Sequence, residues 1–330
     1  MAKRVLLLTT GGTIASRPGA QGLAPELGPA ALLSYVPELG ERFEIDCRAV
    51  LNLDSSNIQP EEWRIIANAV YEGLPGYDGI VVTHGTDTMA YTSSMLSFML
   101  LNLTKPVVLT GSQLPIDEPL TDARINLHTA FSAVEAGIPG VSVAFDRKII
   151  RGCRAVKVST MGFDAFASVN APCLAEVFAD GLRLMSPSAA GSGETVLRDE
   201  LCTDVFLLKL IPSTRPELFD QFLSMNYRGV VIEAFGAGGL HFIRRDLLSK
   251  LQQLEDAGIA VVTCSQCLFE RSDFSLYEVG KLALERGVIE ARDMTTEAAV
   301  TKLMWALGQC DTVEGVRRIF ATNYAGEITL

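Results

Sequence analysis

Long apolar runs are missing from this sequence of 330 residues. No stretch reaches the roughly 18 consecutive apolar residues that a membrane-spanning helix needs. The apolar residues Val5 to Leu8 follow two basic residues, but they are too few for a signal peptide and run directly into Thr-Thr-Gly-Gly. We therefore expect this run to form a first β-strand, and the protein to be soluble and cytoplasmic, with no membrane partner.

Positive charge is in short supply as well. The chain has 28 Lys and Arg against 39 Asp and Glu, which gives a formal net charge of −11. An acidic protein does not attract phosphate backbones, so a nucleic-acid partner is disfavoured. Hydrophobic residues make up 48% and charged residues 20% of the chain, a balance typical of a globular protein rather than of a disordered one.

Patterns of cysteine and histidine that bind metals are also lacking. Seven cysteines, an odd number, are scattered along the chain, which argues against a disulfide framework. Cys264 and Cys267 form a CxxC motif, but no second CxxC and no pair of histidines at ligand spacing accompanies it. We interpret them as two small buried residues at the end of a strand, and we predict no metal and no cofactor.

Short β-branched apolar runs alternate with helical patterns along the chain. This alternation predicts βαβ units and an α/β fold, in which continuous apolar runs form parallel strands buried on both faces. The predicted strands are Arg4–Thr9, Gly79–Thr83, Pro106–Thr110, Val141–Phe145, Val205–Leu210, Gly229–Ala234 and Ala260–Thr263. The predicted helices are Pro60–Tyr71, Thr92–Leu101, Asp122–Glu135, Arg215–Met225, Arg244–Ala257 and Leu276–Arg286.

A domain boundary is indicated by the segment Ser186–Thr195, which is rich in Ser, Ala and Gly. This composition is typical of a flexible linker, and a second series of strands and helices follows it. We predict a larger N-terminal α/β domain over residues 1–185, with a mostly parallel sheet flanked by helices. A linker over 186–203 and a smaller C-terminal α/β domain over 204–330 complete the prediction.

Polar segments follow the ends of several predicted strands, and open parallel sheets bind ligands outside the carboxyl ends of their strands. In TTGGTIAS (9–16), Gly11 and Gly12 allow a sharp turn that exposes backbone N–H groups, and the Thr13 hydroxyl follows. A threonine hydroxyl needs a base or a strong hydrogen-bond acceptor to become a nucleophile. Taken alone, this turn fits a nucleophile, a phosphate cradle or a plain tight turn.

Two further segments carry polar groups next to predicted strands. In VVTHGTDTMAY (81–91), Asp87 can take a proton or bind an ammonium group, and Thr86 can donate and accept. We interpret His84 as a packed, hydrogen-bonded residue at the end of its strand rather than as a general base. Asp54–Ser56 offers a carboxylate and two hydroxyls, and capping of the helix that begins at Pro60 is the alternative interpretation.

Taken together, these segments resemble a known family. TGGTI near residue 10 and HGTDTMAY near residue 84 match the two signature segments of the asparaginase/glutaminase family. LDSSN with PEEW, LTGSQLP, GFDAFAS (162–168) and DMTTEAAVTKLMW (293–305) also resemble its type I, cytoplasmic L-asparaginase branch. The resemblance covers nearly the whole chain and implies an amidohydrolase that converts L-asparagine to L-aspartate and ammonia.

The resemblance also implies roles for single residues. Thr13 matches the threonine that attacks the substrate carboxamide and forms an acyl-enzyme ester. Thr86, Asp87 and Lys157 match a triad in which the lysine and the second threonine move a proton. Backbone N–H groups near the site would hold the oxyanion.

Substrate binding is implied for the neighbouring segment. Asp54, Ser55 and Ser56 match the residues that hold the α-carboxylate and α-amino group of the substrate. Asp87 is expected to bind the ammonium group as well.

The sequence departs from the family pattern at two places. Leu23 stands where the family often carries a loop tyrosine, and we predict that Tyr277 helps near Thr13, from a neighbouring subunit, with a buried aromatic at a helix start as the alternative. Some type I relatives bind asparagine at an allosteric site through a threonine, an arginine and a tyrosine. Val156, Glu233 and Phe235 stand at those positions, so we expect this chain to lack that site.

Other functions remain as alternatives. A dinucleotide-binding oxidoreductase is disfavoured because neither GAGG (236–239) nor the first glycine turn completes GxGxxG with an acidic residue about 20 positions on, and the GxSxG motif of serine hydrolases is absent. A non-catalytic amino-acid-binding protein could dispense with Thr13 and Lys157. Glutaminase activity is open, and so is the amidase subunit of a tRNA-dependent transamidase, which usually has an N-terminal extension. We expect a homodimer or homotetramer, because active sites of this family form between subunits.

Overall fold

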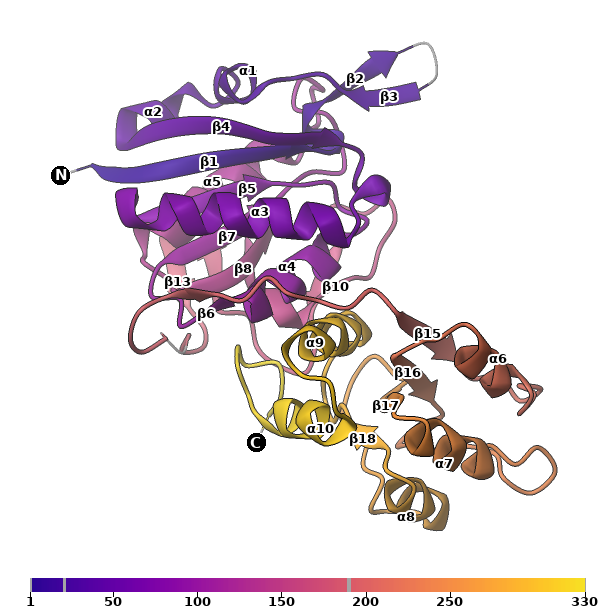
Figure 1. Cartoon of the computed structure of the whole chain (residues 1–330). Coiled ribbons are helices and arrows are strands. Elements are labelled where there is room, and N and C mark those ends of the chain that lie inside the picture. The colour runs from indigo at the N-terminus through magenta and orange to yellow at the C-terminus, as the bar shows by residue number, and fades with distance from the viewer. Residues whose placement is uncertain (1, 20–21, 189–190, 330) are drawn as a thin grey trace. The chain divides into compact units, whose positions relative to one another are not determined.

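The computed structural model describes residues 2–19, 22–188 and 191–329, and the chain divides into two compact units (Figure 1). Unit 1 is Met1–Asp199 and unit 2 is Glu200–Leu330. The division falls inside the predicted linker 186–203, whose extent stays a prediction. Ala189 and Ala190, within that segment, lie outside the described residues.

Unit 1 is built on an eight-stranded sheet. Its strands β4, β1, β5, β7 and β8 run parallel, and β9, β12 and β13 extend the sheet with antiparallel pairs. In spatial order they are β13 (Gly181–Leu184), β12 (Ala175–Phe178), β9 (Lys148–Arg151), β8 (Gly140–Phe145), β7 (Pro106–Thr110), β5 (Gly79–Thr83), β1 (Lys3–Gly11) and β4 (Phe43–Leu53). Every residue of β5 and β7 is buried, which explains their continuous apolar sequences. The predicted strands and the mostly parallel sheet are confirmed.

Helices pack on this sheet. α3 lies against β1 and β4, and α5 packs on β5, β7 and β8. α3 begins where it does because Gln59 and Glu62 form a reciprocal capping box around Pro60, which occupies the first helical position. The helices of unit 1 are α1 (Pro29–Leu33), α2 (Pro37–Arg42), α3 (Pro60–Gly73), α4 (Met89–Met99) and α5 (Ala123–Glu135).

Short elements complete unit 1. They are η1 (Thr13–Ala15), β2 (Ser16–Gly19), β3 (Gly22–Pro25), η2 (Ser55–Asn57), η3 (Leu74–Gly76), β6 (Leu100–Leu101), η4 (Gly152–Arg154), β10 (Ala155–Lys157), β11 (Phe166–Ser168) and β14 (Val196–Leu197). β10 and β11 pair antiparallel and form a short hairpin. This hairpin carries Lys157 to the edge of the sheet where β5 ends, where it contacts Thr86 and Asp87.

Unit 2 has its own parallel sheet. β15 (Val205–Lys209), β16 (Gly229–Ala234), β17 (Ala260–Ser265) and β18 (Ile289–Glu290) lie in that order. The helices are α6 (Leu218–Ser224), α7 (Leu248–Asp256), α8 (Glu278–Glu285), α9 (Thr296–Gln309) and α10 (Val313–Ala321). The predicted strands of this unit and its smaller α/β architecture are confirmed, while α9 and α10 were not among the predicted helices.

No helix in the described ranges is long and apolar enough to cross a membrane. The seven cysteines are all free thiols in the structure.

Candidate active site

Four polar segments meet at one edge of the sheet of unit 1. β1, β4, β5 and β7 are parallel neighbours, so their carboxyl ends lie at the same edge. Thr13 follows β1, Asp54–Ser56 follows β4, and Thr86 and Asp87 follow β5. The segment after β7 contains Gln113.

Close backbone packing holds these segments together. Gly11 and Gly12 have φ values of 103° and 79°, which favour glycine, and a Cβ atom on Gly12 would collide with the backbone of Gly85. A Cβ atom on Gly85 would in turn lie 2.5 Å from Ser55 Oγ. The turn that carries Thr86 is therefore in direct contact with the turns that carry Thr13 and Ser55.

Thr13 is the first residue of η1 and is half-buried. Two hydrogen bonds hold the turn before Thr13 in place. Gly12 N donates to Leu53 O at 2.9 Å, and Ser16 Oγ donates to Gly12 O at 2.9 Å. Within the described residues the Thr13 hydroxyl forms no hydrogen bond, so its proton is not already committed to a protein acceptor. Contacts that form only with substrate bound are common in catalytic sites.

The Asp54–Ser56 segment forms a cap. Asp54 Oδ1 accepts from Ser56 N at 2.8 Å and from Ser56 Oγ at 2.5 Å. Ser55 is buried, and its Oγ accepts from Asp87 N at 3.2 Å while its carbonyl accepts from Thr88 Oγ1 at 2.7 Å. The cap of α3 is Gln59 instead, so the structure separates the two interpretations: Asp54 caps η2, and the segment still lies beside Asp87.

Lys157 joins this group from the β10–β11 hairpin. Its Nζ donates to Thr86 Oγ1 at 2.8 Å and to Asp87 Oδ1 at 2.6 Å. Only 18% of the Lys157 side chain is exposed, against 61% of Asp87, while Thr86 is buried. The Asp87 carboxylate therefore faces solvent on one side, where a cationic ligand can bind to it. On its other side it holds the ammonium group of Lys157, where a proton can be transferred.

His84 is fully buried and supports the turn that carries Thr86. Its Nδ1 lies 2.7 Å from Gly85 O, and its Nε2 lies 2.9 Å from Thr92 Oγ1, which accepts from Trp63 Nε1 at 3.0 Å. Because Gly85 O can only accept, Nδ1 carries the proton and Thr92 donates to Nε2. Burial lowers the pKa of His84 to about 4. A neutral, fully bonded imidazole agrees with the structural interpretation of this residue.

Gln113 is a site residue that the sequence did not single out. Its Oε1 lies 3.4 Å from Thr86 Oγ1, and its Nε2 donates to Thr160 O at 3.1 Å and to Gly162 O at 3.0 Å. The signal in the sequence was its place in LTGSQLP, directly after a buried strand.

Leu23 and Tyr277 mark the departure from the loop tyrosine of the family. Leu23 lies in β3, where it pairs with Pro18, and its side chain is outside the described part of the chain. Tyr277 belongs to unit 2, directly precedes α8 and is 64% exposed, so it is not the buried aromatic of the alternative interpretation. Its relation to Thr13 stays a prediction.

The residues at the expected allosteric positions also lie in different units. Val156 is buried in β10, and Glu233 lies near the end of β16, where it accepts from Thr296 Oγ1 at 2.7 Å and pairs with Lys209 at 3.4 Å. Phe235 exchanges two backbone hydrogen bonds with Gly239. The GAGG turn thus folds back on itself, and α7 begins only at Leu248, which is unlike a dinucleotide-binding turn.

The CxxC interpretation is half wrong. Cys264 is buried in β17, and desolvation raises the pKa of its thiol to about 12. Cys267 is exposed, because it lies in the loop beyond the end of the strand rather than in the strand. Among the described residues, no group of three His, Cys, Asp or Glu is arranged to hold a metal ion.

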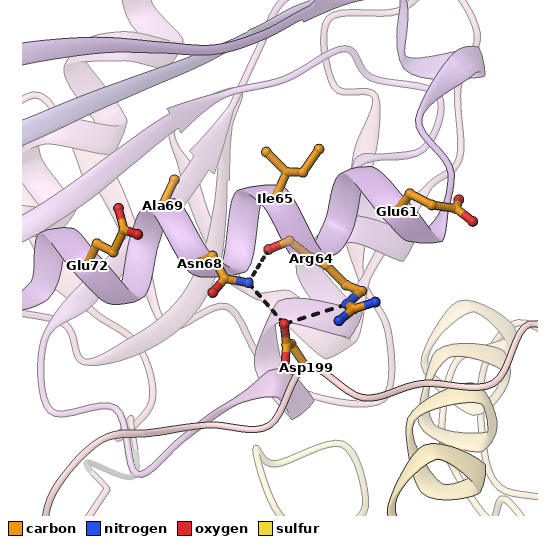
Figure 2. A pocket seen from close by; sticks show the side chains of 7 residues that line it. All are labelled: Glu61, Arg64, Ile65, Asn68, Ala69, Glu72 and Asp199. Carbon is orange, nitrogen blue, oxygen red and sulfur yellow. Dashed lines mark hydrogen bonds and ion pairs between the residues drawn. The ribbon is translucent and has the colours of Figure 1, made fainter.

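A groove of about 580 Å³ lies along the outer face of α3, away from these residues (Figure 2). Asp199 closes one side of it by accepting from Asn68 Nδ2 at 3.0 Å and pairing with Arg64 Nε at 3.5 Å. Figure 2 shows the polar side chains along the helix with Ile65 and Ala69 between them. None of the predicted site residues is among the seven that line it: Glu61, Arg64, Ile65, Asn68, Ala69, Glu72 and Asp199.

Family models match both units of the chain. "Asparaginase, N-terminal" matches residues 4–189, and "Glutaminase/Asparaginase C-terminal domain" matches residues 204–320. The chain therefore belongs to the asparaginase family.

Individual relatives agree with this assignment. The chain is 45% identical to the L-asparaginase of Thermococcus kodakarensis over 99% of both chains. It is 36% identical to a glutamyl-tRNA(Gln) amidotransferase subunit of Pyrococcus furiosus over 98% of this chain and 76% of the relative.

Solved structures are similar over the whole chain as well. The thermostable L-asparaginase from Thermococcus kodakarensis has a TM-score of 0.93 at 45% identity, with 99% of each chain covered. A probable cytoplasmic L-asparaginase from Campylobacter jejuni has a TM-score of 0.83 at 26% identity, covering 97% of this chain and all of that one.

Proposed function

We propose that this member of the asparaginase family is an L-asparaginase, which hydrolyses L-asparagine to L-aspartate and ammonia through an acyl-enzyme on Thr13. One observation carries the proposal. Lys157 Nζ contacts both Thr86 and Asp87 across 71 and 70 residues of chain, at the sheet edge that also carries Thr13. Family membership along both units and an L-asparaginase relative of matching length support the substrate.

The first half-reaction forms an ester and releases ammonia. Thr13 Oγ1 attacks the side-chain carboxamide carbon of asparagine, and the carbonyl oxygen takes up negative charge that backbone N–H groups stabilise. When the C–N bond breaks, the nitrogen receives a proton and leaves as ammonia. The aspartyl group stays attached to Thr13 through its side-chain carbonyl.

The second half-reaction returns Thr13. Water attacks the same carbonyl carbon, the ester C–O bond breaks, and the Thr13 oxygen regains a proton while aspartate leaves. In this step Lys157 acts as the free amine: it receives the proton of the attacking hydroxyl or water through Thr86 and returns it to the leaving group, and the Asp87 carboxylate stabilises the ammonium group that forms in between. The 2.8 Å contact between Lys157 Nζ and Thr86 Oγ1 supports this relay.

Substrate orientation is assigned to the segment after β4 and to Asp87. The carboxylate of Asp87 is 61% exposed and can bind the α-ammonium group, while hydroxyls and backbone N–H groups of Ser55 and Ser56 hold the α-carboxylate. Asp54 orients Ser56 through its two hydrogen bonds and adds negative charge for the ammonium group.

The quaternary structure and compartment belong to the same proposal. We infer a cytoplasmic homodimer or homotetramer in which Tyr277 reaches the Thr13 site of a neighbouring subunit. Tyr277 and Leu276 are 64% and 62% exposed and offer an apolar contact surface. Seven free thiols fit a reducing compartment.

Subunit sharing can be tested by mixing two variants. If Thr13→Ala and Tyr277→Phe each impair the enzyme, a dissociated and reassociated mixture contains one site with neither change and regains activity. A monomer in light scattering, or a mixture as inactive as its parts, would contradict the arrangement.

A second candidate is an amidase that supplies ammonia to a tRNA-linked reaction, or an enzyme that prefers glutamine. The 36% identity to a glutamyl-tRNA(Gln) amidotransferase subunit does not favour it, since the identity to an L-asparaginase is higher, at 45%, and covers 99% of that relative rather than 76%. We also propose that the chain lacks an allosteric asparagine site. Glu233 stands where an arginine would pair with the carboxylate of asparagine, so the charge at this position is reversed. Sigmoidal asparagine kinetics would contradict it.

Ammonia release from L-asparagine and from L-glutamine tests the proposal. The wild type should prefer asparagine, and Thr13→Ala should lose the activity with either substrate. Thr195→Ala should keep it, since the Thr195 hydroxyl donates to Asn102 O at 3.3 Å and lies outside the proposed site. Preference for glutamine would favour the second candidate. Binding of asparagine without any turnover would favour a non-catalytic binding protein.

A further inference from the structure

Gln113 lies between two parts of the site that are far apart in the sequence. Its amide group can adopt only one orientation, because Nε2 faces two carbonyls, Thr160 O at 3.1 Å and Gly162 O at 3.0 Å, which only accept. Oε1 therefore faces the hydroxyl of Thr86, at 3.4 Å. An amide oxygen cannot donate, so the Thr86 hydroxyl points its proton toward Gln113, while Lys157 donates to the Thr86 oxygen.

The backbone of Gln113 is held by a separate set of hydrogen bonds. Its backbone N–H donates to both carboxylate oxygens of Asp122 at 3.0 Å, and the N–H of Leu114 donates to Asp122 Oδ1 at 3.2 Å. Asn126 Nδ2 donates to the same carboxylate at 3.0 Å and to Gly111 O at 2.9 Å. Helix α5 thus holds the turn after β7 in place, and the side chain extends from a rigid support.

The part that Gln113 fastens is the exposed tip of a hairpin whose base is buried. Thr160 and Gly162 belong to the tip of the β10–β11 hairpin, which has only three backbone pairs, the last of them Lys157 with Phe166. Val158 N closes the tip by donating to Ala165 O at 2.8 Å. Phe166 anchors the base of the hairpin, since it is buried and its ring lies 5.0 Å from that of Phe145. A two-stranded ribbon is marginal by itself, so the tip beyond Lys157 depends on the anchor that Gln113 supplies.

We propose that Gln113 is a positioning residue that sets the Lys157–Thr86 contact from both sides. It holds the hairpin of Lys157 through its two donated hydrogen bonds, and it holds the rotamer of Thr86 by accepting from its hydroxyl. The inference rests on the proposed function, since that contact is its proton relay. The hydrogen bonds of the Gln113 side chain go to Thr86 and to the hairpin rather than to the Asp54–Ser56 segment, so its loss should affect turnover more than substrate binding.

Two variants separate the halves of this role. Gln113→Ala removes the contact with Thr86 and the contacts with the hairpin. Gln113→Glu keeps an oxygen toward Thr86 but loses the donors to Thr160 O and Gly162 O. Displacement of a catalytic group by about 1 Å can cost about 100-fold in rate, so we expect kcat to fall about 10- to 100-fold in Gln113→Ala with an unchanged KM for asparagine. Gln113→Glu should show a loss of similar size, because the hairpin is released.

Gln266 provides a matched control in unit 2. Its Nε2 also donates to two carbonyls, Leu210 O at 2.6 Å and Glu233 O at 2.9 Å, and these bonds lie outside the proposed relay. Gln266→Glu makes the same chemical change at the same kind of clasp. It should leave kcat unchanged.

Hydrogen exchange at the amide of Val158 completes the test and does not depend on activity. Exchange should be faster in Gln113→Ala than in wild type if Gln113 fastens the hairpin. Unchanged exchange, an unchanged kcat, or an effect on KM alone would overturn the proposal. A wild type that releases no ammonia, combined with faster exchange in the variant, would sink the proposed function and leave the fastening role of Gln113 standing.

Discussion

Lys157 Nζ lies 2.6 Å from Asp87 Oδ1, although 70 residues separate the two along the chain. The same Nζ lies 2.8 Å from Thr86 Oγ1. A turn after a buried strand supplies the acceptors and a short hairpin supplies the donor. The proposed relay therefore depends on the relative placement of two backbone segments.

Removal of the Lys157 ammonium group should stop proton transfer without emptying the substrate site. General acid–base groups contribute about 100- to 10,000-fold, so Lys157→Met should lower kcat for asparagine by that range and leave aspartate affinity near the wild-type value. Lys250→Met is a close control, because Lys250 pairs with Asp220 at the same 2.6 Å and is also 18% exposed. Equal losses in the two variants would point to a structural effect of any lost ion pair.

Substitution of Gly85 should weaken substrate binding rather than stability alone. Gly85→Ala would place a Cβ atom 2.5 Å from Ser55 Oγ and 2.7 Å from Ser55 Cβ, so Ser55 must shift from its place beside Asp87. We expect KM for asparagine to rise. Gly76→Ala, where no atom lies within 4 Å of the added Cβ, should leave KM unchanged. A normal KM in Gly85→Ala would show that Ser55 does not hold the substrate.

Acid should destabilise the fold through His84. Its pKa is about 4 in the folded protein against an ordinary value of 6.5, so the unfolded chain binds the proton more readily. Stability from this group is complete above pH 6.5 and is lost as the pH falls from 6.5 to about 4. The lowered pKa of His84 corresponds to about 3 kcal/mol in the free energy of unfolding.

Urea unfolding of wild type and His84→Gln across that pH range checks the sign and the size. The free energy of unfolding should fall more steeply with acid in the wild type than in the variant, because only the wild type has the titrating imidazole. Parallel curves for the two proteins would contradict the assignment of a neutral, buried His84.

The end of the chain should depend on one buried ion pair. Lys302 Nζ lies 2.6 Å from Glu327 Oε1, and both side chains are fully buried. Glu327 also accepts from the backbone of Tyr324 and Ala325, so it fixes the turn after α10. Lys302→Met leaves this carboxylate uncompensated, and the free energy of unfolding should fall by about 3–5 kcal/mol.

An exposed pair and a double variant provide the comparison. Arg183→Met breaks the ion pair between Arg183 and Asp180, whose side chains are 56% and 64% exposed, respectively. It should lower the free energy of unfolding by no more than about 1 kcal/mol. Lys302→Met combined with Glu327→Gln should recover part of the loss, because no charge is then left buried. A cost for Lys302→Met as small as that for Arg183→Met would refute the buried role.

The central strands could be predicted from the sequence because burial on both faces leaves a clear signal. β5 and β7 are apolar throughout and fully buried. β4 was missed, although it is the longest strand at 11 residues, because it pairs only with β1 at the sheet edge and carries alternating exposed charges such as Glu44 and Arg48. Helix α9 was missed for a related reason, since it is buried nearly all round and lacks a polar face.

Site residues near strand ends were also accessible to prediction, and distant ones were not. Thr86 and Asp87 directly follow a strong strand pattern, so their place at the carboxyl edge followed from it. Nothing in the local sequence of Lys157 places it there, and only the family resemblance indicated it. Gln113 was missed because its role depends on carbonyls of a hairpin 47 and 49 residues away. Cys267 was expected to be buried at the end of the strand, but β17 ends at Ser265 and the chain then leaves the sheet.

Identification of the covalently modified residue tests the central claim most directly. The wild type can be mixed with excess L-asparagine, quenched in acid during turnover and digested for mass spectrometry. We predict an aspartyl ester on the peptide that contains Thr13, and no ester in the Thr13→Ala variant treated in the same way. An ester on another residue, or undiminished ammonia release by Thr13→Ala, would contradict it.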